Sequence, residues 1–227
     1  MRIAESYDDH RREAWRGKAG AYERSFASLC FHPVPVMLDA LAVGGGTRVL
    51  DIGCGTGSLA EAAARRGAAV AAVDAEPSMV RATAERVPTA RTEVAVLPAL
   101  PFADATFDAV AANFVVNYVA PPAEAVAEMA RVTCPGRRVA VTVWPHPKPP
   151  LQRLWDDVLD AAHVERPPIP SLAPEDDFPH TIAGLRELLV GAGLGAVESR
   201  RLEWQDRVDP EEWWAGAAAG IATSATS

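Results

Sequence analysis

Short apolar runs alternate with alanine-rich segments of helical character through the middle of the chain. The apolar runs cover residues 47–52, 68–74, 93–97, 107–114 and 137–144, and the segments with helical character cover residues 58–65, 78–86 and 123–133. Because the runs are nearly continuous, we expect strands that are buried on both faces. The order of elements predicts an α/β fold with a Rossmann-like, doubly wound, mostly parallel sheet and helices on both faces.

The segments on either side of this core have a different pattern. Residues 10–29 and 36–41 predict helices, which we expect to form an N-terminal helical cover at the carboxyl edge of the sheet. Nine of the 19 prolines fall within residues 145–179, which predicts a loop. After this loop we expect a helix over residues 181–191, a strand over residues 196–208, and a helix that begins at Asp209-Pro210.

These patterns predict one domain over residues 1–227. Its parts are a helical cover (1–45), a ligand-binding core (46–144), a Pro-rich loop or lid with a helix (145–180), and a C-terminal helix–strand–helix (181–227). The sequence shows no internal repeats.

Composition narrows the choice of partners. The chain has 227 residues with 22 Lys+Arg against 30 Asp+Glu, a formal net charge of −8. Phosphate binding needs a basic face, so we expect no nucleic-acid partner and favour a small molecule. No apolar run reaches the ~18 residues of a membrane span, so we expect no membrane partner. Three widely spaced cysteines and a charged N-terminus without a signal-peptide pattern favour a reduced, cytoplasmic setting.

The most informative segment is Val49-Leu50-Asp51-Ile52-Gly53-Cys54-Gly55-Thr56-Gly57. Here a buried strand turns through three alternating glycines into a helix, and glycine lets the backbone approach a ligand closely. Asp74 ends the next strand, where a carboxylate can accept hydrogen bonds from ribose hydroxyls. An isolated glycine pair is equally well explained as a tight turn, but the three features together favour a nucleoside-containing cofactor.

From residue 38 to residue 144 the sequence resembles the class I S-adenosylmethionine-dependent methyltransferases, small-molecule type. The resemblance implies that Gly53, Cys54, Gly55 and Gly57 form the loop beneath the methionine part of S-adenosyl-L-methionine and that Asp51 supports this loop. It also implies that Asp74 binds the ribose. Residues 73–79 are similar to the second motif of the family, which places Ala75 and Met79 beside the adenine; an ordinary core position is the alternative for Met79.

The stretch Leu100-Pro101-Phe102-Ala103-Asp104 is similar to the segment that leads many of these enzymes into their fourth strand. Relatives often carry an acid just before it, and this chain has Val96 and Leu97, followed by Pro98. Adenine recognition would then depend on the Leu97 N–H and on apolar contact. The resemblance further places Asn113 at the methionine moiety, with a strand-end turn as the alternative. It also places Tyr22 in a helix that covers the methionine end.

Two other function classes stay open. A nicotinamide-dependent Rossmann oxidoreductase would bind NAD(P) on a Gly-x-Gly-x-x-Gly loop, which is one residue longer than the loop found here. A catalytically inactive cofactor-binding protein can share the same fold. The Leu-Pro-Phe segment and the intact loop favour the methyltransferase.

Methyl transfer from a sulfonium is an in-line displacement, in which alignment of the reacting atoms supplies much of the rate. A catalytic base is optional, so the catalytic residues stay unknown; candidates are His10, His146, His180 and Tyr118, and a plain surface role is the alternative for the histidines. No histidine has metal-ligand spacing, and Glu175-Asp176-Asp177 is typical of a solvated loop, so we expect no metal. The segment Asn113-Phe114-Val115-Val116 lacks the Asn-Pro-Pro-aromatic element of nucleic-acid amino methylation.

Two expectations concern the overall assembly. The family sheet has seven strands and only six candidates are visible, so a bare sheet edge predicts a homo-oligomer or a truncated chain. We also expect the acceptor to lie under a mobile cover formed by residues 10–26 and 145–179, where Tyr22 and Tyr118 touch cofactor or acceptor.

Overall fold

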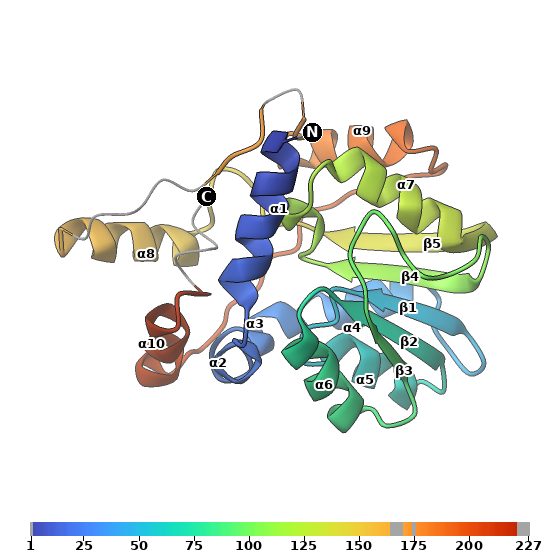
Figure 1. Cartoon of the computed structure of the whole chain (residues 1–227), viewed down its shortest axis with the longest axis horizontal. Coiled ribbons are helices and arrows are strands. Elements are labelled where there is room, and N and C mark those ends of the chain that lie inside the picture. Colours follow the sequence, from blue (N-terminus) through green and yellow to red (C-terminus); the bar gives the residue numbers. More distant parts are fainter. Residues whose placement is uncertain (1, 164–169, 174–175, 222–227) are drawn as a thin grey trace.

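The computed structural model describes residues 2–163, 170–173 and 176–221. Its centre is a parallel sheet with the strand order β3-β2-β1-β4-β5 (Figure 1). The strands are β1 (Arg48–Ile52), β2 (Ala69–Asp74), β3 (Arg91–Val94), β4 (Phe107–Asn113) and β5 (Thr133–Thr142). Since β1 lies between β2 and β4, the strand order reverses beside β1. In open α/β sheets ligands bind at such a point, outside the carboxyl ends of the strands.

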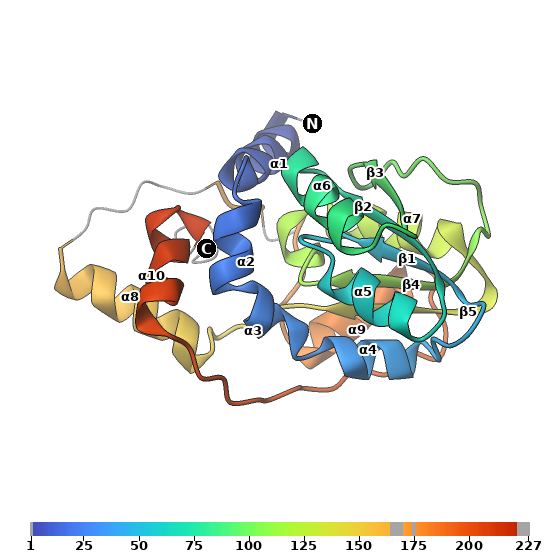
Figure 2. The ribbon, with the colours of Figure 1, turned by 90° about the horizontal axis from the view of Figure 1, so that it is seen from below.

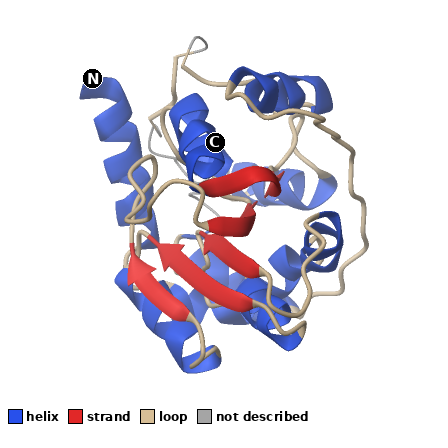
Figure 3. Ribbon diagram, turned by 90° about the vertical axis from the view of Figure 1, so that its right-hand side faces the viewer, coloured by secondary structure: helices blue, strands red, loops and turns tan. Residues whose placement is uncertain are grey.

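Helices cover both faces of the sheet, as Figure 3 shows. Along β1, Val49 packs into one buried cluster and Leu50 into the other, as the two-residue period of a strand requires. The cluster around Val49 includes residues of α4 (Val34–Ala40) and α5 (Ser58–Arg65). The cluster around Leu50 includes residues of α7 (Pro122–Val132) and α9 (Ile182–Gly191). The doubly wound fold predicted from the apolar runs is therefore confirmed.

Three short helices stand at the carboxyl ends of the strands. They are α1 (Arg2–Trp15), α2 (Ala19–Ser25) and α3 (Ala27–Phe31), and Figure 2 shows them beside the sheet. The break between α1 and α2 falls at Gly17, whose φ is +69° and whose N–H donates to Glu76 Oε1 at 3.1 Å. The end of α3 is fixed by Asn113, whose Nδ2 donates to Cys30 O at 2.8 Å. The predicted N-terminal helical cover is thus present.

The remaining described elements are α6 (Pro77–Arg86), which packs on β2 and β3, the short 3-10 helix η1 (Val116–Tyr118) after β4, α8 (Pro150–Ala161), and α10 (Pro210–Ala218). The expected Pro-rich loop is described except for residues 164–169 and 174–175, which lie outside the described part of the chain, as do residues 222–227. Glu175 of the acidic run therefore lies outside it too.

The strand predicted over residues 196–208 was wrong. This segment is irregular, so the described part of the chain has five strands instead of the six expected. Its apolar positions are used elsewhere: Trp204 stacks on His32 with ring centroids 5.4 Å apart, and Val208 packs with Trp213. Between them, Asp206 lies 3.5 Å from His32, and Arg207 is exposed. Strand β5 is consequently an edge strand of the described sheet. The formation of a homo-oligomer by pairing at that edge stays a prediction.

Candidate functional site

The glycine loop between β1 and α5 has a backbone conformation that residues with a Cβ atom rarely adopt. Gly53, Gly55 and Gly57 have φ values of +65°, +54° and +89°. A Cβ on Gly53 would lie 2.3 Å from Val115 Cγ2, and a Cβ on Gly57 would lie 3.1 Å from the Thr83 backbone of α6. The first glycine therefore allows close approach of the segment after β4, and the third allows α5 and α6 to pack.

Asp74, at the end of β2, connects the loop to the next helix. Its Oδ2 accepts a hydrogen bond from the Gly55 N–H at 2.9 Å, and its Oδ1 accepts one from the Glu76 N–H at 2.9 Å. Burial raises the pKa of this carboxyl, and the two backbone donors oppose the rise. The carboxylate of Asp74 is therefore bonded to the backbone of the glycine loop, and both Asp74 and Gly55 line the cavity.

Asp51 lies below the loop and is only 1% exposed. Its Oδ2 has no hydrogen-bond partner, and burial together with the nearby charge of Asp74 raises its pKa to about 8, against a backbone hydrogen bond from Ala60 that lowers it. An isolated buried carboxylate is costly, so the apo protein holds this group largely protonated at neutral pH. A cation placed near the loop would favour its ionised form.

A cavity of about 1810 Å³ opens where the strands end. Eight of the twelve residues predicted to bind the cofactor line it: Tyr22, Gly53, Gly55, Asp74, Ala75, Met79, Leu97 and Asn113. The other four stay outside its described lining: Asp51, Cys54, Gly57 and Pro98. Asp51 and Cys54 instead border a small cavity of about 20 Å³ beneath the loop. The cavity thus lies at the expected edge of the sheet.

Residues on the β2 and β3 side form the predicted adenine end. Met79 is buried on α6, one helical turn beyond Ala75, and Leu97 is buried in the loop after β3. Glu76 is also in the cavity wall, where its Oε1 accepts hydrogen bonds from Gly17 N and Ser78 N, both at 3.1 Å. This end is therefore apolar at its base and acidic at its rim.

Helix α2 lies directly over the glycine loop. A Cβ on Gly55 would be 3.3 Å from Tyr22 Cε1, so the tyrosine ring is in contact range of the loop backbone. The next residue, Glu23, accepts hydrogen bonds from Thr56 Oγ1 and pairs with Arg86 of α6. The helix that carries Tyr22 is thus fastened to the loop and to the helix after β2.

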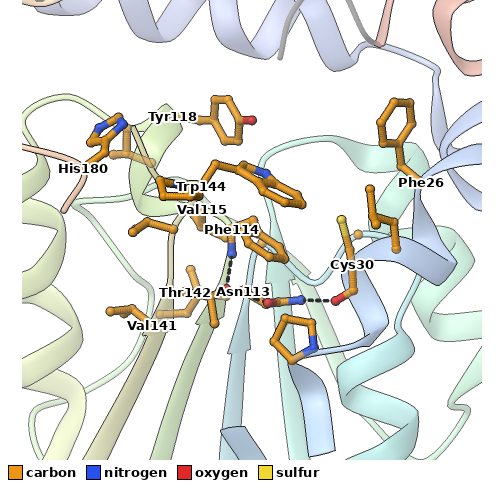
Figure 4. Close-up of a pocket in the computed structure, with 18 of the residues that line it drawn as sticks. Phe26, Cys30, Asn113, Phe114, Val115, Tyr118, Val141, Thr142, Trp144 and His180 are labelled. Atoms are coloured by element: carbon orange, nitrogen blue, oxygen red, sulfur yellow. Dashed lines mark hydrogen bonds between the residues drawn. The ribbon is translucent and has the colours of Figure 1, made fainter. Parts of the chain in front are cut away.

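Asn113 occupies the predicted position at the end of β4. Both ends of its amide are engaged, since Nδ2 donates to Cys30 O and Oδ1 accepts from Thr142 Oγ1 at 2.6 Å (Figure 4). The side chain therefore joins α3, β4 and β5 at the floor of the cavity.

The half of the cavity away from β2 is aromatic. Phe114 and Trp144 stack with centroids 4.0 Å apart and an interplanar angle of 8°, and Tyr118 borders the same space (Figure 4). The guanidinium of Arg11, from α1, lies 4.9 Å from the Tyr7 ring and 5.3 Å from the Tyr118 ring. Burial raises the pKa of Tyr118, so its phenol stays protonated at neutral pH.

The three candidate histidines separate in the structure. His10 is exposed on α1 and outside the described cavity lining, whereas His146 and His180 are both part of it. The His146 N–H donates to His180 O at 2.9 Å, and His180 Nδ1 lies 3.2 Å from Asn117 Nδ2. His10 is therefore not brought together with the other candidates.

Three residues of the site were missed from the sequence: Arg11 and Glu76 line the cavity, and Asn117 holds the lining residue Trp144. Arg11 belongs to a charged run with the pattern of a solvated helix, and its burial follows from the docking of α1 on η1. Asn117 follows β4 in a 3-10 turn, and nothing in the sequence distinguishes it from other loop asparagines. Glu76 gave one usable signal, because a side-chain cap before Pro77 is expected to turn toward the helix N-terminus.

The described residues hold neither a cluster of metal ligands nor a helix suited to crossing a membrane. Within residues 2–163, 170–173 and 176–221, no group of three or more His, Cys, Asp or Glu side chains is placed to hold a metal ion. No helix in those ranges combines the length and the apolar character that a bilayer crossing requires.

Comparison with known proteins agrees with this geometry. Residues 50–141 match a family model described as a methyltransferase domain. The chain is 39% identical over 112 residues to a demethylmenaquinone methyltransferase of Renibacterium salmoninarum, covering 49% of this chain and 47% of that protein. It is 29% identical over 171 residues to a malonyl-[acyl-carrier protein] O-methyltransferase of Salmonella typhimurium, covering 75% and 66%. The chain spans about half the length of the demethylmenaquinone methyltransferases it matches.

Solved structures show the same fold. An S-adenosylmethionine-dependent methyltransferase of Aquifex aeolicus superposes with a TM-score of 0.55 at 20% identity, covering 74% of this chain and 83% of that one. A phosphoethanolamine N-methyltransferase of Haemonchus contortus, solved with S-adenosylhomocysteine, superposes with a TM-score of 0.59 at 19% identity, covering 79% and 42%. The glycine loop, the strand order and these matches agree: residues 50–141 match a methyltransferase domain, and the fold is that of these solved methyltransferases.

Proposed function

We propose that this chain binds S-adenosyl-L-methionine at the carboxyl ends of β1, β2 and β4 and transfers its methyl group to a small organic acceptor in the same cavity. The observation that carries the proposal is the loop from Gly53 to Gly57, which opens on the cavity with the Asp74 carboxylate hydrogen-bonded to its central glycine. The acceptor atom, whether oxygen, nitrogen or carbon, is left open.

The chemistry of the loop suits a cation better than a diphosphate. In dinucleotide-binding proteins the backbone N–H groups of this turn receive the pyrophosphate. Here the Gly55 N–H is donated to the Asp74 carboxylate, and Asp51 lies below with an unpartnered oxygen. A phosphate group would meet negative charge at this position. The sulfonium and the ammonium of S-adenosylmethionine would meet attraction, and Asp51 would ionise toward them.

When bound, the cofactor would supply a methyl group on a sulfonium. An acceptor nucleophile would bond to the methyl carbon as the carbon–sulfur bond broke, the electron pair would stay on sulfur, and the acceptor's proton would pass to solvent. Asp74 would hold the ribose, Tyr22 would cover the methionine end, and Met79 and Leu97 would border the adenine. The protein's part is to align the reacting atoms and exclude water, for which proximity can contribute ~7–11 kcal/mol. The raised pKa of Tyr118 disfavours that residue as a base.

Relatives that act on demethylmenaquinone and on malonyl-[acyl-carrier protein] support a small organic group as the acceptor, since both names denote methylation of such a group. The Rossmann oxidoreductase is the competing function, and it makes the opposite ligand prediction.

Calorimetry with purified protein tests the proposal. We expect S-adenosylmethionine and S-adenosylhomocysteine to bind with micromolar affinity and NAD to show no saturable binding. Asp74→Asn removes the charge that accepts the ribose hydroxyls, so affinity should fall about tenfold or more. Glu93→Gln is the matched control, because this carboxylate on β3 pairs with Arg91 outside the cavity lining. Saturable NAD binding without binding of the sulfonium would reverse the proposal.

A further inference from the structure

The indole of Trp144 lines the cavity, stacks on the ring of Phe114, and lies tilted at 49° to the ring of Trp204, with centroids 6.4 Å apart. Its partner Phe114 lies 4.0 Å away and nearly parallel. Figure 4 shows the indole between Phe114 and the space that Tyr118 and Phe26 border, and all four residues line the cavity. The stack therefore presents a flat aromatic surface to any molecule that enters this half of the cavity.

Phe114 is held in this stack at a cost. Its φ is +57°, a left-handed conformation that bulky residues rarely adopt because Cβ then crowds the backbone. Its N–H donates to Thr142 O at 3.1 Å and to Thr142 Oγ1 at 2.9 Å, so β5 fixes the strained residue. Strain of this kind persists where the surroundings over-determine a position, and it is concentrated at ligand sites.

Asn117 fixes Trp144 through both of its backbone polar groups. The Trp144 N–H donates to Asn117 Oδ1 at 3.0 Å, and Asn117 Nδ2 donates to Trp144 O at 3.2 Å. These two bonds also settle the orientation of the amide, because turning it over would face donor with donor and acceptor with acceptor. The amide NH₂ therefore also faces His180 Nδ1, 3.2 Å away.

This geometry decides the state of His180. Nδ1 is therefore the ring's acceptor toward Asn117, which leaves Nε2 as the ring's donor. Nε2 lies 3.6 Å from Asp177 Oδ1 and is buried. The lone pair that a general base needs is thus committed to Asn117. His180, a base candidate from the sequence, instead helps to hold Asn117 and through it Trp144.

We propose that Trp144 is the platform on which a planar aromatic acceptor stacks, and that Asn117 is the positioning residue that holds the platform. This inference rests on the proposed function, since the acceptor is defined by methyl transfer. The platform lies next to the part of the cavity proposed for the cofactor, because Phe114 directly follows Asn113 at the end of β4. Offset stacking favours a flat ring over a puckered one of the same skeleton.

A pair of probes with one skeleton tests the platform: 2-naphthol, which is flat, and decahydro-2-naphthol, which is puckered. Dissociation constants are measured by equilibrium dialysis with and without saturating S-adenosylhomocysteine. We expect the ratio of the two constants to favour the flat probe in the wild type. In Trp144→Leu the preference for the flat probe, taken as the dissociation constant of the puckered probe divided by that of the flat one, should fall about three- to tenfold. Trp214→Leu, an exposed tryptophan of α10 at 55% exposure and outside the described cavity lining, should leave the ratio unchanged.

Asn117→Ala separates positioning from a general structural role. Loss of positioning should lower the same ratio and should remove the single Nε2–H tautomer of His180, read from ring ¹⁵N shifts. A purely structural Asn117 would instead weaken both probes equally and leave their ratio at the wild-type value, which would overturn its assigned role. An unchanged ratio in Trp144→Leu would overturn the platform.

Cofactor titration of the same preparations keeps the two proposals apart. A protein that binds S-adenosylhomocysteine but shows no dependence of the ratio on Trp144 refutes the platform alone. A protein that keeps the ratio but binds no S-adenosylhomocysteine refutes the methyltransferase proposal, and with it the meaning of the platform as an acceptor site.

Discussion

Replacing Asp51 by asparagine should make the apo protein more stable at neutral pH and change how its stability depends on pH. The wild-type carboxyl has a pKa of about 8 in the folded state, against an ordinary value of 3.8 for an exposed aspartate. Below pH ~4 both states hold the proton, and this contribution to stability is fully present. As pH rises from ~4 to ~8 the unfolded chain ionises while the native state does not, so stability is lost. Above the folded pKa the loss is complete.

The magnitude follows from linkage. Each pH unit in this window costs ~1.36 kcal/mol, so the wild type is penalised by about 4 kcal/mol at pH 7. Asparagine has no such penalty, but its NH₂ group needs a partner in the place of Oδ2, which offsets about 1–3 kcal/mol at every pH. The net gain at pH 7 is therefore about 1–3 kcal/mol, and the diagnostic quantity is its slope with pH: the variant's advantage should grow by about 2.7 kcal/mol from pH 5.5 to pH 7.5.

Urea unfolding followed by circular dichroism at several pH values measures this slope. Asp108→Asn is the control, because its pairing with Arg48 and Arg137 lowers the pKa of Asp108 to about 2 and keeps it ionised throughout the range. The difference between that variant and the wild type should be flat. An equally flat difference for Asp51→Asn would show that Asp51 is ionised in the native protein, and the reasoning about the buried carboxyl would fail.

Two further variants test the loop and its cover. Gly53→Ala combines a left-handed conformation with a contact at 2.3 Å from Val115, so the free energy of unfolding should fall by about 2–5 kcal/mol. Gly46→Ala is the control, because Gly46 has a φ of +79° and open space around it, and it should lose only about 1–2 kcal/mol. Equal losses in the two variants would show that the contact with Val115 does not matter. Tyr22→Ala opens the cavity over the loop, so we expect at least a tenfold lower kcat/KM with a nearly unchanged Tm of the apo protein. A large fall in Tm would assign Tyr22 to the core.

The core of the fold could be predicted because each of its signals is local. Beta1, the glycine turn and α5 follow one another within 18 residues, and every step has its own residue pattern, from the apolar run to Gly57. The segment over residues 196–208 has the composition of a strand, yet a strand also needs a neighbour, and the sequence does not say whether one is present. Tertiary pairing therefore decided against local propensity.

The candidate site divides in the same way. Asp74 and the glycines carry their signal in spacing, and they lie together at the cavity as expected. Arg11 lines the cavity and Asn117 holds the lining residue Trp144 because distant segments meet there, with Tyr7 Oη donating to Asn117 O at 3.0 Å across 110 residues. Contacts of this kind leave no trace in a single sequence, because each partner satisfies its own local pattern equally well without the other.

The glycine loop and the aromatic stack border one continuous cavity of about 1810 Å³, larger than the ~300–1,000 Å³ of a pocket for one small ligand. Space for two ligands side by side predicts the kinetic mechanism. Methyl donor and methyl acceptor would be bound together, and the group would pass between them without resting on the protein. Initial rates measured at several fixed concentrations of one substrate should then give double-reciprocal lines that intersect, the pattern of a ternary complex, and S-adenosylhomocysteine should compete with the donor.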